Sequence, residues 1–389
     1  MSGSTSVAVV GGGIGGMAAA LALAAIGCDV RVHEQAGSVT ELGAGIQLSP
    51  NCTRVLRGLG LLDAVARVAV APEAIEFRRW DDARLLSRTP LGADVEEAYG
   101  APYLHVHRGD LMRVLLAALP ADRVEVGRRC VAVRHRGPGA ELHFADGTSE
   151  AVDVVVGADG IHSAVRTALF GAEDARFTGH VAYRGLVPAD RVAHLGLARR
   201  CTIRLGPGAH VVHYFVGAGR LLNVVCVREE GAWTRESWTD PGDPAELRAA
   251  FATWHPAVRA IVAALEAPLK WAMFDRPPLP SWGSGAVTLL GDACHPMLPY
   301  SAQGAAQAIE DADALATCLA DRGADGIEGA LARYADLRRD RTTRVAGISR
   351  DNGVRFHLPD GAQQRARDAA MAAASGIAPD IDWLYGRAS

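Results

Sequence analysis

The first forty residues alternate between apolar runs and glycine in a way that predicts regular structure. Residues 7–10 form a short apolar run with β-branched side chains, and Ala and Leu dominate residues 17–26 after a glycine-rich stretch. A run of the first kind favours a strand, and one of the second kind favours a helix. Residues 29–34 again favour a strand. The chain is therefore predicted to begin with a strand–helix–strand unit.

Further along, helical patterns lie near residues 51–68 and 109–119. Alternating apolar and polar positions at 124–127, 130–136 and 140–145 predict strands, the last of which ends in the turn Asp146-Gly147. An apolar strand at residues 152–156 is predicted to return to a parallel sheet. These elements indicate an α/β fold.

The pattern changes after about residue 175. Strands are predicted at residues 181–187, 202–205, 210–216 and 221–227, with a helix near 244–265. An apolar strand at 286–290 and a helical pattern at 302–319 then resemble the first part again. We expect a discontinuous nucleotide-binding domain at residues 1–174 and 276–389, with a mixed-sheet substrate domain inserted at 175–275. The tail from about residue 328 is predicted to be helical, with the pair Asn352-Gly353 breaking it.

Composition is ordinary for a globular enzyme, with 49% hydrophobic and 22% charged residues. The formal net charge of −4 provides no general basic field for nucleic acid or an anionic membrane. Five glycines interrupt the first apolar run, which argues against a signal peptide or a membrane span. Seven scattered cysteines give no metal-binding or disulfide spacing. We expect a cytoplasmic monomer or homodimer without a metal.

Glycines at three positions between the first strand and helix form a dinucleotide-binding fingerprint. Gly11 would make the tight turn, Gly13 would let backbone N–H groups approach a pyrophosphate, and Gly16 would allow close helix packing. The helix N-terminus supplies partial positive charge. Glu34, at the end of the second strand, would accept hydrogen bonds from the adenosine ribose. A carboxylate there argues against a 2′-phosphate, which leaves FAD or NAD as the ligand.

Two later strands each end in a glycine and an aspartate. Asp159 lies in a Gly-Ala-Asp-Gly segment after one strand, and Asp292 follows Gly291 after the other. Three motifs in this order, joined by the segments 43–51 and 107–111, resemble the class A flavoprotein aromatic hydroxylases, the group that contains p-hydroxybenzoate hydroxylase and salicylate hydroxylase. The resemblance covers nearly the whole chain and implies bound FAD. A second complete GxGxxG is absent from the sequence, so NADH or NADPH is expected to dock only transiently.

The resemblance also implies roles for individual residues. Asp292 corresponds to the aspartate that binds the ribityl chain, and Arg108 to a flavin-contacting arginine. Asp159 is likened to an acid where the cofactors meet, although an ordinary Asp-Gly turn is a strong alternative explanation. Helix N-terminal amides near Gly304 and Ala305 would face the pyrimidine ring of the flavin. Further cofactor contacts are expected at Ile14, Gly15, Gln35, Gly45 and Val131.

The strand at 210–216 offers the groups that ring hydroxylation needs. Strand alternation puts His210 and Tyr214 on one face and His213 on the other. We expect His210 to act as base or proton relay and Tyr214 as hydrogen-bond donor, with His213 as a weaker alternative. The resemblance puts the carbonyl of Pro299 and the side chain of Gln47 against the substrate. His295 could suggest a metal ligand, but packing explains it better.

These observations predict an FAD-dependent monooxygenase. It would use NAD(P)H and O2, through a flavin C4a-hydroperoxide, to hydroxylate a small aromatic ring bearing hydroxyl and carboxylate groups. Two alternatives remain open at this point. One is a tailoring hydroxylase of a larger polyketide or alkaloid. The other is a flavin-binding protein without turnover.

Overall fold

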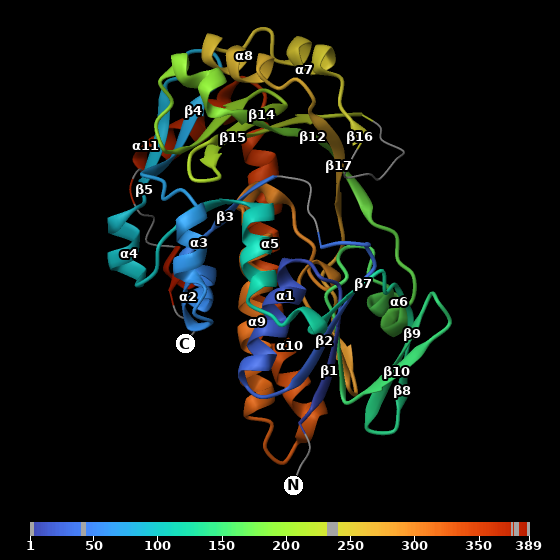
Figure 1. The fold of residues 1–389 in the computed structure, drawn as a ribbon. Coiled ribbons are helices and arrows are strands. Elements are labelled where there is room, and N and C mark those ends of the chain that lie inside the picture. The colour runs from blue at the N-terminus through green and yellow to red at the C-terminus, as the bar shows by residue number, and fades with distance from the viewer. Residues whose placement is uncertain (1–3, 40–43, 232–239, 375, 377–380, 387–389) are drawn as a thin grey trace.

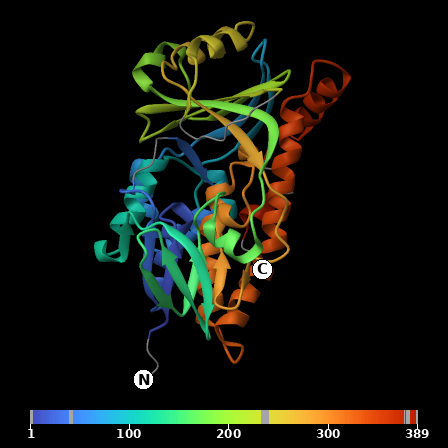
Figure 2. The same ribbon diagram turned by 90° about the vertical axis from the view of Figure 1, so that its right-hand side faces the viewer.

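Two sheets and a group of long helices make up the computed structural model, which describes residues 4–39, 44–231, 240–374, 376 and 381–386. Gly43, the first residue of the segment 43–51, lies outside these ranges. Figure 1 and Figure 2 show the larger sheet at one end of the molecule and the smaller, largely parallel sheet at the other, with long helices beside it. The site described below lies between the two.

The smaller sheet is built mainly of parallel strands. In spatial order its strands are β18 (Gly283–Ser284), β19 (Val287–Leu289), β11 (Val154–Gly157), β1 (Ser6–Val10), β2 (Asp29–Glu34) and β7 (Val124–Val126). Strand β1 runs parallel to both β11 and β2, and only β18 is antiparallel to its neighbour. Nearly every residue of β1 is buried, as expected for a parallel strand covered on both faces.

Helices cover one face of this sheet, where they lie side by side in Figure 1. They are α1 (Ile14–Ala25), α5 (Arg108–Ala117), α9 (Gly304–Ala320) and α10 (Gly326–Phe356). The other face carries α6 (Ala164–Phe170) and a small antiparallel sheet of β8 (Cys130–Arg136), β9 (Gly139–Phe144) and β10 (Ser149–Val152). The predicted strand at 152–156 is therefore wrong in its start: Val152 ends antiparallel β10, and the parallel strand begins at Val154.

The larger sheet has eight strands. In spatial order they are β16 (Asp240–Pro241), β17 (Leu269–Asp275), β12 (Arg176–Pro188), β15 (Leu221–Glu229), β14 (Ala209–Val216), β13 (Cys201–Gly206), β4 (Ala74–Arg79) and β5 (Leu85–Pro90). Helices α7 (Pro244–Ala250) and α8 (Pro256–Ala263) cover its outer face through a core that includes Phe251 and Trp254. The single helix predicted near 244–265 is thus two helices.

The sheet pairing also changes the expected boundary at residue 175. Strands β4 and β5 come from the predicted nucleotide-binding segment, yet β4 pairs with β13 of the larger sheet. Sequence order could not show this, because the pairing joins residues more than a hundred positions apart. The two-domain division itself stays a prediction.

The remaining elements lie around these two sheets. They are β3 (Gly45–Leu48), β6 (Leu104–His107), α2 (Pro50–Gly58), α3 (Leu62–Val68), α4 (Ala93–Tyr99), α11 (Ala362–Ala373), α12 (Asp382–Tyr385) and the short 3-10 helices η1 (Ala121–Arg123), η2 (Ala189–Leu195), η3 (Gly291–Ala293) and η4 (Pro299–Ser301).

The helix predicted at 51–68 is divided by a turn at Gly60, whose φ is +73°. Conversely, Asn352-Gly353 does not break the tail, because α10 continues to Phe356.

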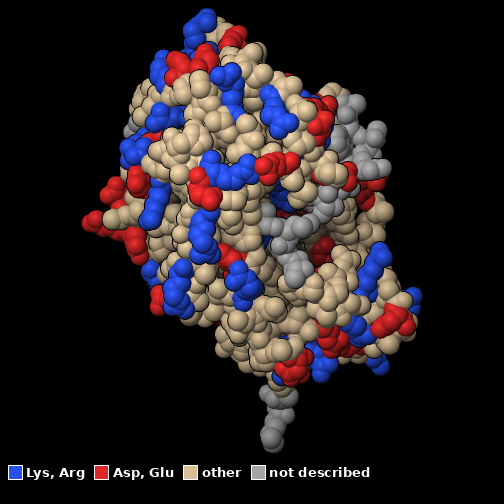
Figure 3. Space-filling model, turned by 45° about the horizontal axis from the view of Figure 1, so that its top comes forward, with Lys and Arg blue, Asp and Glu red and all other residues tan. Residues whose placement is uncertain are grey.

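Surface charge is mixed on the face shown in Figure 3, where basic and acidic side chains are interspersed. Within the part of the chain that the structure describes, no helix combines the length and the apolar character needed to cross a bilayer.

Candidate active site

A cavity of about 550 Å³ lies between the larger sheet and the glycine turn that begins α1. It brings together residues from both ends of the chain. The predicted site residues that line it are Gly13, Ile14, Gly15, Gly45, Gln47, Arg108, His210, Tyr214, Asp292, Pro299, Gly304 and Ala305. Those that do not line it are Gly11, Gly16, Glu34, Gln35, Val131, Asp159 and His213.

The three fingerprint glycines differ in what a side chain would meet. A Cβ on Gly11 would collide with the carbonyl of Ala158, and one on Gly16 would collide with the carbonyl of Gly11. Gly11 also has a φ of +105°. A Cβ on Gly13, by contrast, would meet no atom within 4 Å. Gly11 and Gly16 are thus required by packing, and Gly13 leaves open space over the start of α1, where a diphosphate fits.

Glu34 lies at the end of β2, beside this turn. Its carboxylate accepts hydrogen bonds from the backbone N–H groups of Gly12 at 2.7 Å and Ala36 at 2.8 Å. The carboxylate is therefore held next to the open space above Gly13, at the place where an adenosine ribose would follow the diphosphate. Gln35 is exposed nearby.

Arg108 and Asp292 bring opposite charges to the cavity wall. Burial lowers the pKa of the Arg108 guanidinium, and the charge of Asp292 opposes that effect. Burial raises the pKa of the Asp292 carboxyl, which the charges of His295 and Arg108 oppose. Arg108 is the first residue of α5, and Asp292 lies in η3, shortly after β19. They provide one donor and one acceptor for a polar cofactor.

Two of the cofactor residues expected from the resemblance have other surroundings. Asp159 accepts hydrogen bonds from the Ser163 hydroxyl at 2.5 Å and from the N–H groups of Ala164 at 2.7 Å and Val165 at 3.2 Å. It thus binds the start of α6, so the ordinary turn explanation accounts for its contacts. Val131 is 49% exposed on β8.

Strand β14 shows the alternation that the sequence predicted. His210, Val212 and Tyr214 line the cavity, whereas Val211 packs into the core beneath α7 and α8. His213 also faces away from the cavity. Burial, followed by the charges of Arg204 and Arg78, lowers its pKa to about 3. His213 therefore has no access to a ring bound in the cavity, which removes the basis for the alternative assignment.

His210 is buried and bonded to a second histidine. Its Nδ1 lies 2.7 Å from Nε2 of His357, at the C-terminal end of α10. Burial, then the neighbouring His357 and His180, holds the pKa of His210 well below its usual value. The side chain is neutral at physiological pH, and its low pKa makes it a weak base, so a proton taken up from the cavity would have to pass on through the bond to His357.

Tyr214 stands four residues further along the same strand, so it is about 13 Å from His210 along β14. Its ring centroid lies 4.4 Å from that of His105. Burial raises the pKa of its phenol, and a hydrogen bond with Gln47 opposes this. The Tyr103 hydroxyl donates to Oε1 of Gln47 at 2.6 Å. Tyr214 and Gln47 therefore form one polar end of the cavity, apart from His210.

Sequence reasoning missed Arg184, a half-buried cation that also lines the cavity. Its guanidinium carbon lies 4.3 Å from the centre of the Trp271 ring. Burial, then the charge of Arg108, lowers its pKa to about 10, which leaves it cationic at neutral pH. The sequence does carry a signal for this residue. The outer face of β12 is apolar and bears Val181, Tyr183 and Val187, so strand alternation makes the charged residue at 184 face inward.

The loop that follows Asp292 includes the other predicted residues. Pro299 begins η4 and is exposed to the cavity. His295 is buried, and its Nε2 lies 2.5 Å from Asp311, which also accepts from Nε of Arg338 at 2.7 Å. His295 thus belongs to a buried ionic network behind the cavity.

Known proteins resemble this chain over nearly its whole length. The family model described as an FAD binding domain matches residues 4–349. The chain is 47% identical to a 3-amino-4-hydroxybenzoate 2-monooxygenase of Streptomyces platensis, covering 98% of this chain and 95% of the relative. It is 40% identical to a 6-hydroxynicotinate 3-monooxygenase of Bordetella bronchiseptica, covering 90% and 92%.

Among solved structures, the Klebsiella pneumoniae R204Q HpxO complex with FAD superposes with a TM-score of 0.86 at 28% identity, covering 95% of each chain. The open space at Gly13, the helix terminus and the Arg108–Asp292 pair fit the same cofactor here. The chain therefore belongs to the FAD binding domain family and, within it, to the class A flavoprotein aromatic hydroxylases, which are FAD-dependent monooxygenases.

Proposed function

We propose that the protein hydroxylates a single-ring hydroxybenzoate, with 3-amino-4-hydroxybenzoate as the first candidate, using NAD(P)H and O2. Bound FAD, once reduced by NAD(P)H, supplies the activated oxygen. The side chains of the chain itself bind the ring, position it and handle its proton. The relatives named above, which act on a hydroxybenzoate and a hydroxynicotinate, support a ring with both a carboxylate and a hydroxyl.

The observation that carries this proposal is the inner face of the larger sheet. Val212, Val225 and Val227 form an apolar patch on the cavity wall, and His210, Tyr214 and Arg184 stand around it. Val225 is the cross-strand partner of both Val212 and Arg184. A flat ring can lie on the valines with one polar substituent at Arg184 and another at His210, while Tyr214 borders the far end of the patch.

Charge favours an anionic substituent at Arg184. Two cations, Arg108 and Arg184, line a cavity to which Asp292 contributes the acidic side chain, and each arginine disfavours the other's charge. A carboxylate beside Arg184 would relieve that repulsion and accept charge-assisted hydrogen bonds. The ring hydroxyl would then lie toward His210, whose neutral imidazole can take its proton while it passes one on to His357, and this raises the electron density of the ring.

The cavity of about 550 Å³ is large enough to hold a flavin ring together with a substrate of one ring.

Arg184→Met tests the carboxylate contact. We expect the KM for 3-amino-4-hydroxybenzoate to rise about ten- to a hundredfold, because a hydrogen bond to a charged group contributes about 1.5–3 kcal/mol. Steady-state NAD(P)H oxidation, with product identification, measures this. For 2-aminophenol, the same ring without the carboxylate, variant and wild type should have similar KM values.

Arg191→Met, which removes an exposed arginine paired with Glu266, is the matched control and should leave both constants unchanged. An unaltered KM for the benzoate in Arg184→Met would exclude the carboxylate contact. If none of 3-amino-4-hydroxybenzoate, 4-hydroxybenzoate, salicylate, 3-hydroxybenzoate or 6-hydroxynicotinate stimulates oxidation by the FAD-loaded wild type, the proposed function is wrong.

A further inference from the structure

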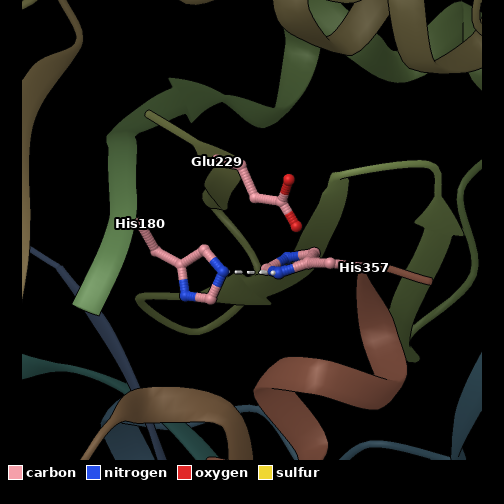
Figure 4. Close-up of side chains that lie close together, drawn as sticks. All are labelled: His180, Glu229 and His357. Carbon is pink, nitrogen blue, oxygen red and sulfur yellow. Dashed lines mark hydrogen bonds between the residues drawn. The ribbon is translucent and has the colours of Figure 1, made fainter. Parts of the chain in front are cut away.

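Three side chains from distant parts of the chain converge next to His210, behind the residues that line the cavity. They are His180 on β12, Glu229 at the end of β15 and His357, which follows α10. Figure 4 shows the two imidazole rings and the carboxylate pointing toward a common space. Nε2 of His180 and Nδ1 of His357 are 3.1 Å apart, and the Glu229 carboxylate lies within 4.8 Å of a ring nitrogen of each histidine.

Backbone hydrogen bonds hold the three residues in place. His180 and Glu229 are direct partners across the antiparallel pair β12–β15, so their side chains share one face of the sheet. The N–H of Gly208 donates to the carbonyl of His357 at 3.0 Å, and the N–H of Glu229 donates to the carbonyl of Gly208 at 2.9 Å. The cluster is therefore built by the sheet and by the turn between β13 and β14.

Two imidazoles and one carboxylate are a ligand set that Zn²⁺ and similar ions prefer. With Zn–N bonds of about 2.0–2.1 Å, the ligand atoms of a tetrahedral site lie about 3.3 Å apart, so the histidine nitrogens need only small movements. Glu229 is exposed and His180 half-buried, which gives an ion and a water ligand access from solvent.

The hydrogen bond between the two imidazole rings has to open for a metal to bind. One of the two facing nitrogens carries the proton of that bond, and this proton has to move to the other nitrogen of its own ring before both lone pairs can turn to an ion.

His357 connects this cluster to the cavity. Its Nε2 is 2.7 Å from Nδ1 of His210, so a metal on Nδ1 of His357 would keep the proton of that ring on Nε2. Nε2 of His357 would then donate to His210, whose own proton must lie on its remaining nitrogen, Nε2. His210 would present a donor to the cavity. Without the metal, the bond between His357 and His180 can take either direction, and His210 can present a lone pair.

We propose that His180, Glu229 and His357 form a binding site for a divalent transition metal ion of Zn²⁺ chemistry, and that the bound ion inhibits turnover by fixing His210 as a donor. The binding part is independent of the activity. The inhibition part rests on the proposed function, because it needs His210 to accept a proton from the ring.

Binding is tested on the FAD-loaded full chain after treatment with a chelator. Titration with Zn²⁺ by calorimetry should give one ion per chain, and Co²⁺ should give the visible absorption of a tetrahedral N/O site beyond the flavin bands. Glu229→Gln and His180→Gln should each weaken binding about tenfold or more, since each removes a protein ligand. His194→Gln, which removes an exposed histidine outside the cluster, should bind like wild type. No binding by the wild type, or equal binding by the Glu229 and His180 variants, overturns the site.

Inhibition is tested with the same proteins. Zn²⁺ should lower kcat of the wild type with little change in KM, whereas the rate of Glu229→Gln with Zn²⁺ should match its own rate without it. Metal binding that leaves wild-type kcat unchanged overturns the coupling to His210. If the wild type binds Zn²⁺ at this site but no ring compound stimulates its NAD(P)H oxidation, the metal site stands and the proposed function is wrong.

Discussion

His210 and His213 lie on the same strand but on opposite faces of the larger sheet. His210 lines the cavity, and His213 is buried on the other side near Arg204. Both residues are buried histidines on one strand, so residue type and burial do not distinguish them. The side-chain direction does, because successive residues of a strand point to opposite faces.

Substituting each histidine in turn tests this assignment. We expect His210→Asn to lower kcat about a hundredfold or more, the usual contribution of a positioned base. His213→Asn should leave kcat within about threefold, because its side chain does not reach the ring. Stopped-flow and steady-state rates with the best substrate measure both variants, and their flavin spectra check that FAD is bound. Equal losses in the two variants would contradict a base role specific to His210.

At the scale of elements, α10 shows how packing overrides a local breaking signal. Gly353 follows Asn352 inside this helix, yet the helix continues to Phe356. A Cβ on Gly353 would come within 2.8 Å of the Tyr300 ring, so the glycine allows a close contact between α10 and η4. The hydroxyl of Tyr300 in turn lies 2.9 Å from Nδ1 of His180. The helix thus positions the wall of the cavity.

Two glycines of α10 give a matched pair for this argument. The methyl group added by Gly347→Ala meets no atom within 4 Å. This substitution should stabilise the protein by up to about 1 kcal/mol, because alanine has the higher helix propensity. Gly353→Ala should destabilise it, because overpacking against Tyr300 costs about 1–3 kcal/mol and exceeds that gain. The midpoint of urea unfolding should therefore be higher than that of the wild type for the first variant and lower for the second. A rise for both would show that Tyr300 moves aside freely.

At the scale of the whole molecule, buried neutral histidines make stability depend on pH. The pKa values of His105, His213 and His357 are each lowered to about 3, mainly by burial. In the unfolded chain a histidine has a pKa of about 6.5. Below that pH the unfolded chain binds protons that the folded protein does not. The free energy of unfolding should therefore be constant above about pH 6.5 and should fall as the pH decreases toward 3.

Each such histidine contributes about 1.4 kcal/mol per pH unit once the pH is well below 6.5. Urea unfolding at pH 7.5, 6.5 and 5.5 measures the slope before most carboxylates titrate. In His213→Gln the dependence of the unfolding free energy on pH should correspond to about one proton fewer, whatever the variant does to stability at pH 7.5. A slope that is unchanged in this variant would mean that His213 is protonated in the folded protein.

The sequence by itself determined the parts of this protein that depend on neighbouring residues. The strand–turn–helix with Gly11, Gly13 and Gly16, the positions of Asp292 and Arg108 at element ends, and the alternation of β14 all follow from local sterics and periodicity. The glycine fingerprint left FAD or NAD open, the resemblance carried by the three motifs implied FAD, and the family match confirms FAD. The roles of the single site residues stay predictions.

Only the tertiary structure decided which side chains face one another. Arg184 and His210 face one cavity because β12, β15 and β14 pair in that order, and β4 joins the same sheet from an earlier part of the chain. The meeting of His180, Glu229 and His357 depends on a cross-strand pair and on where α10 ends. Contacts of this kind join residues far apart in sequence, and they depend on which strands become neighbours in the sheet, which the pattern within either strand does not show.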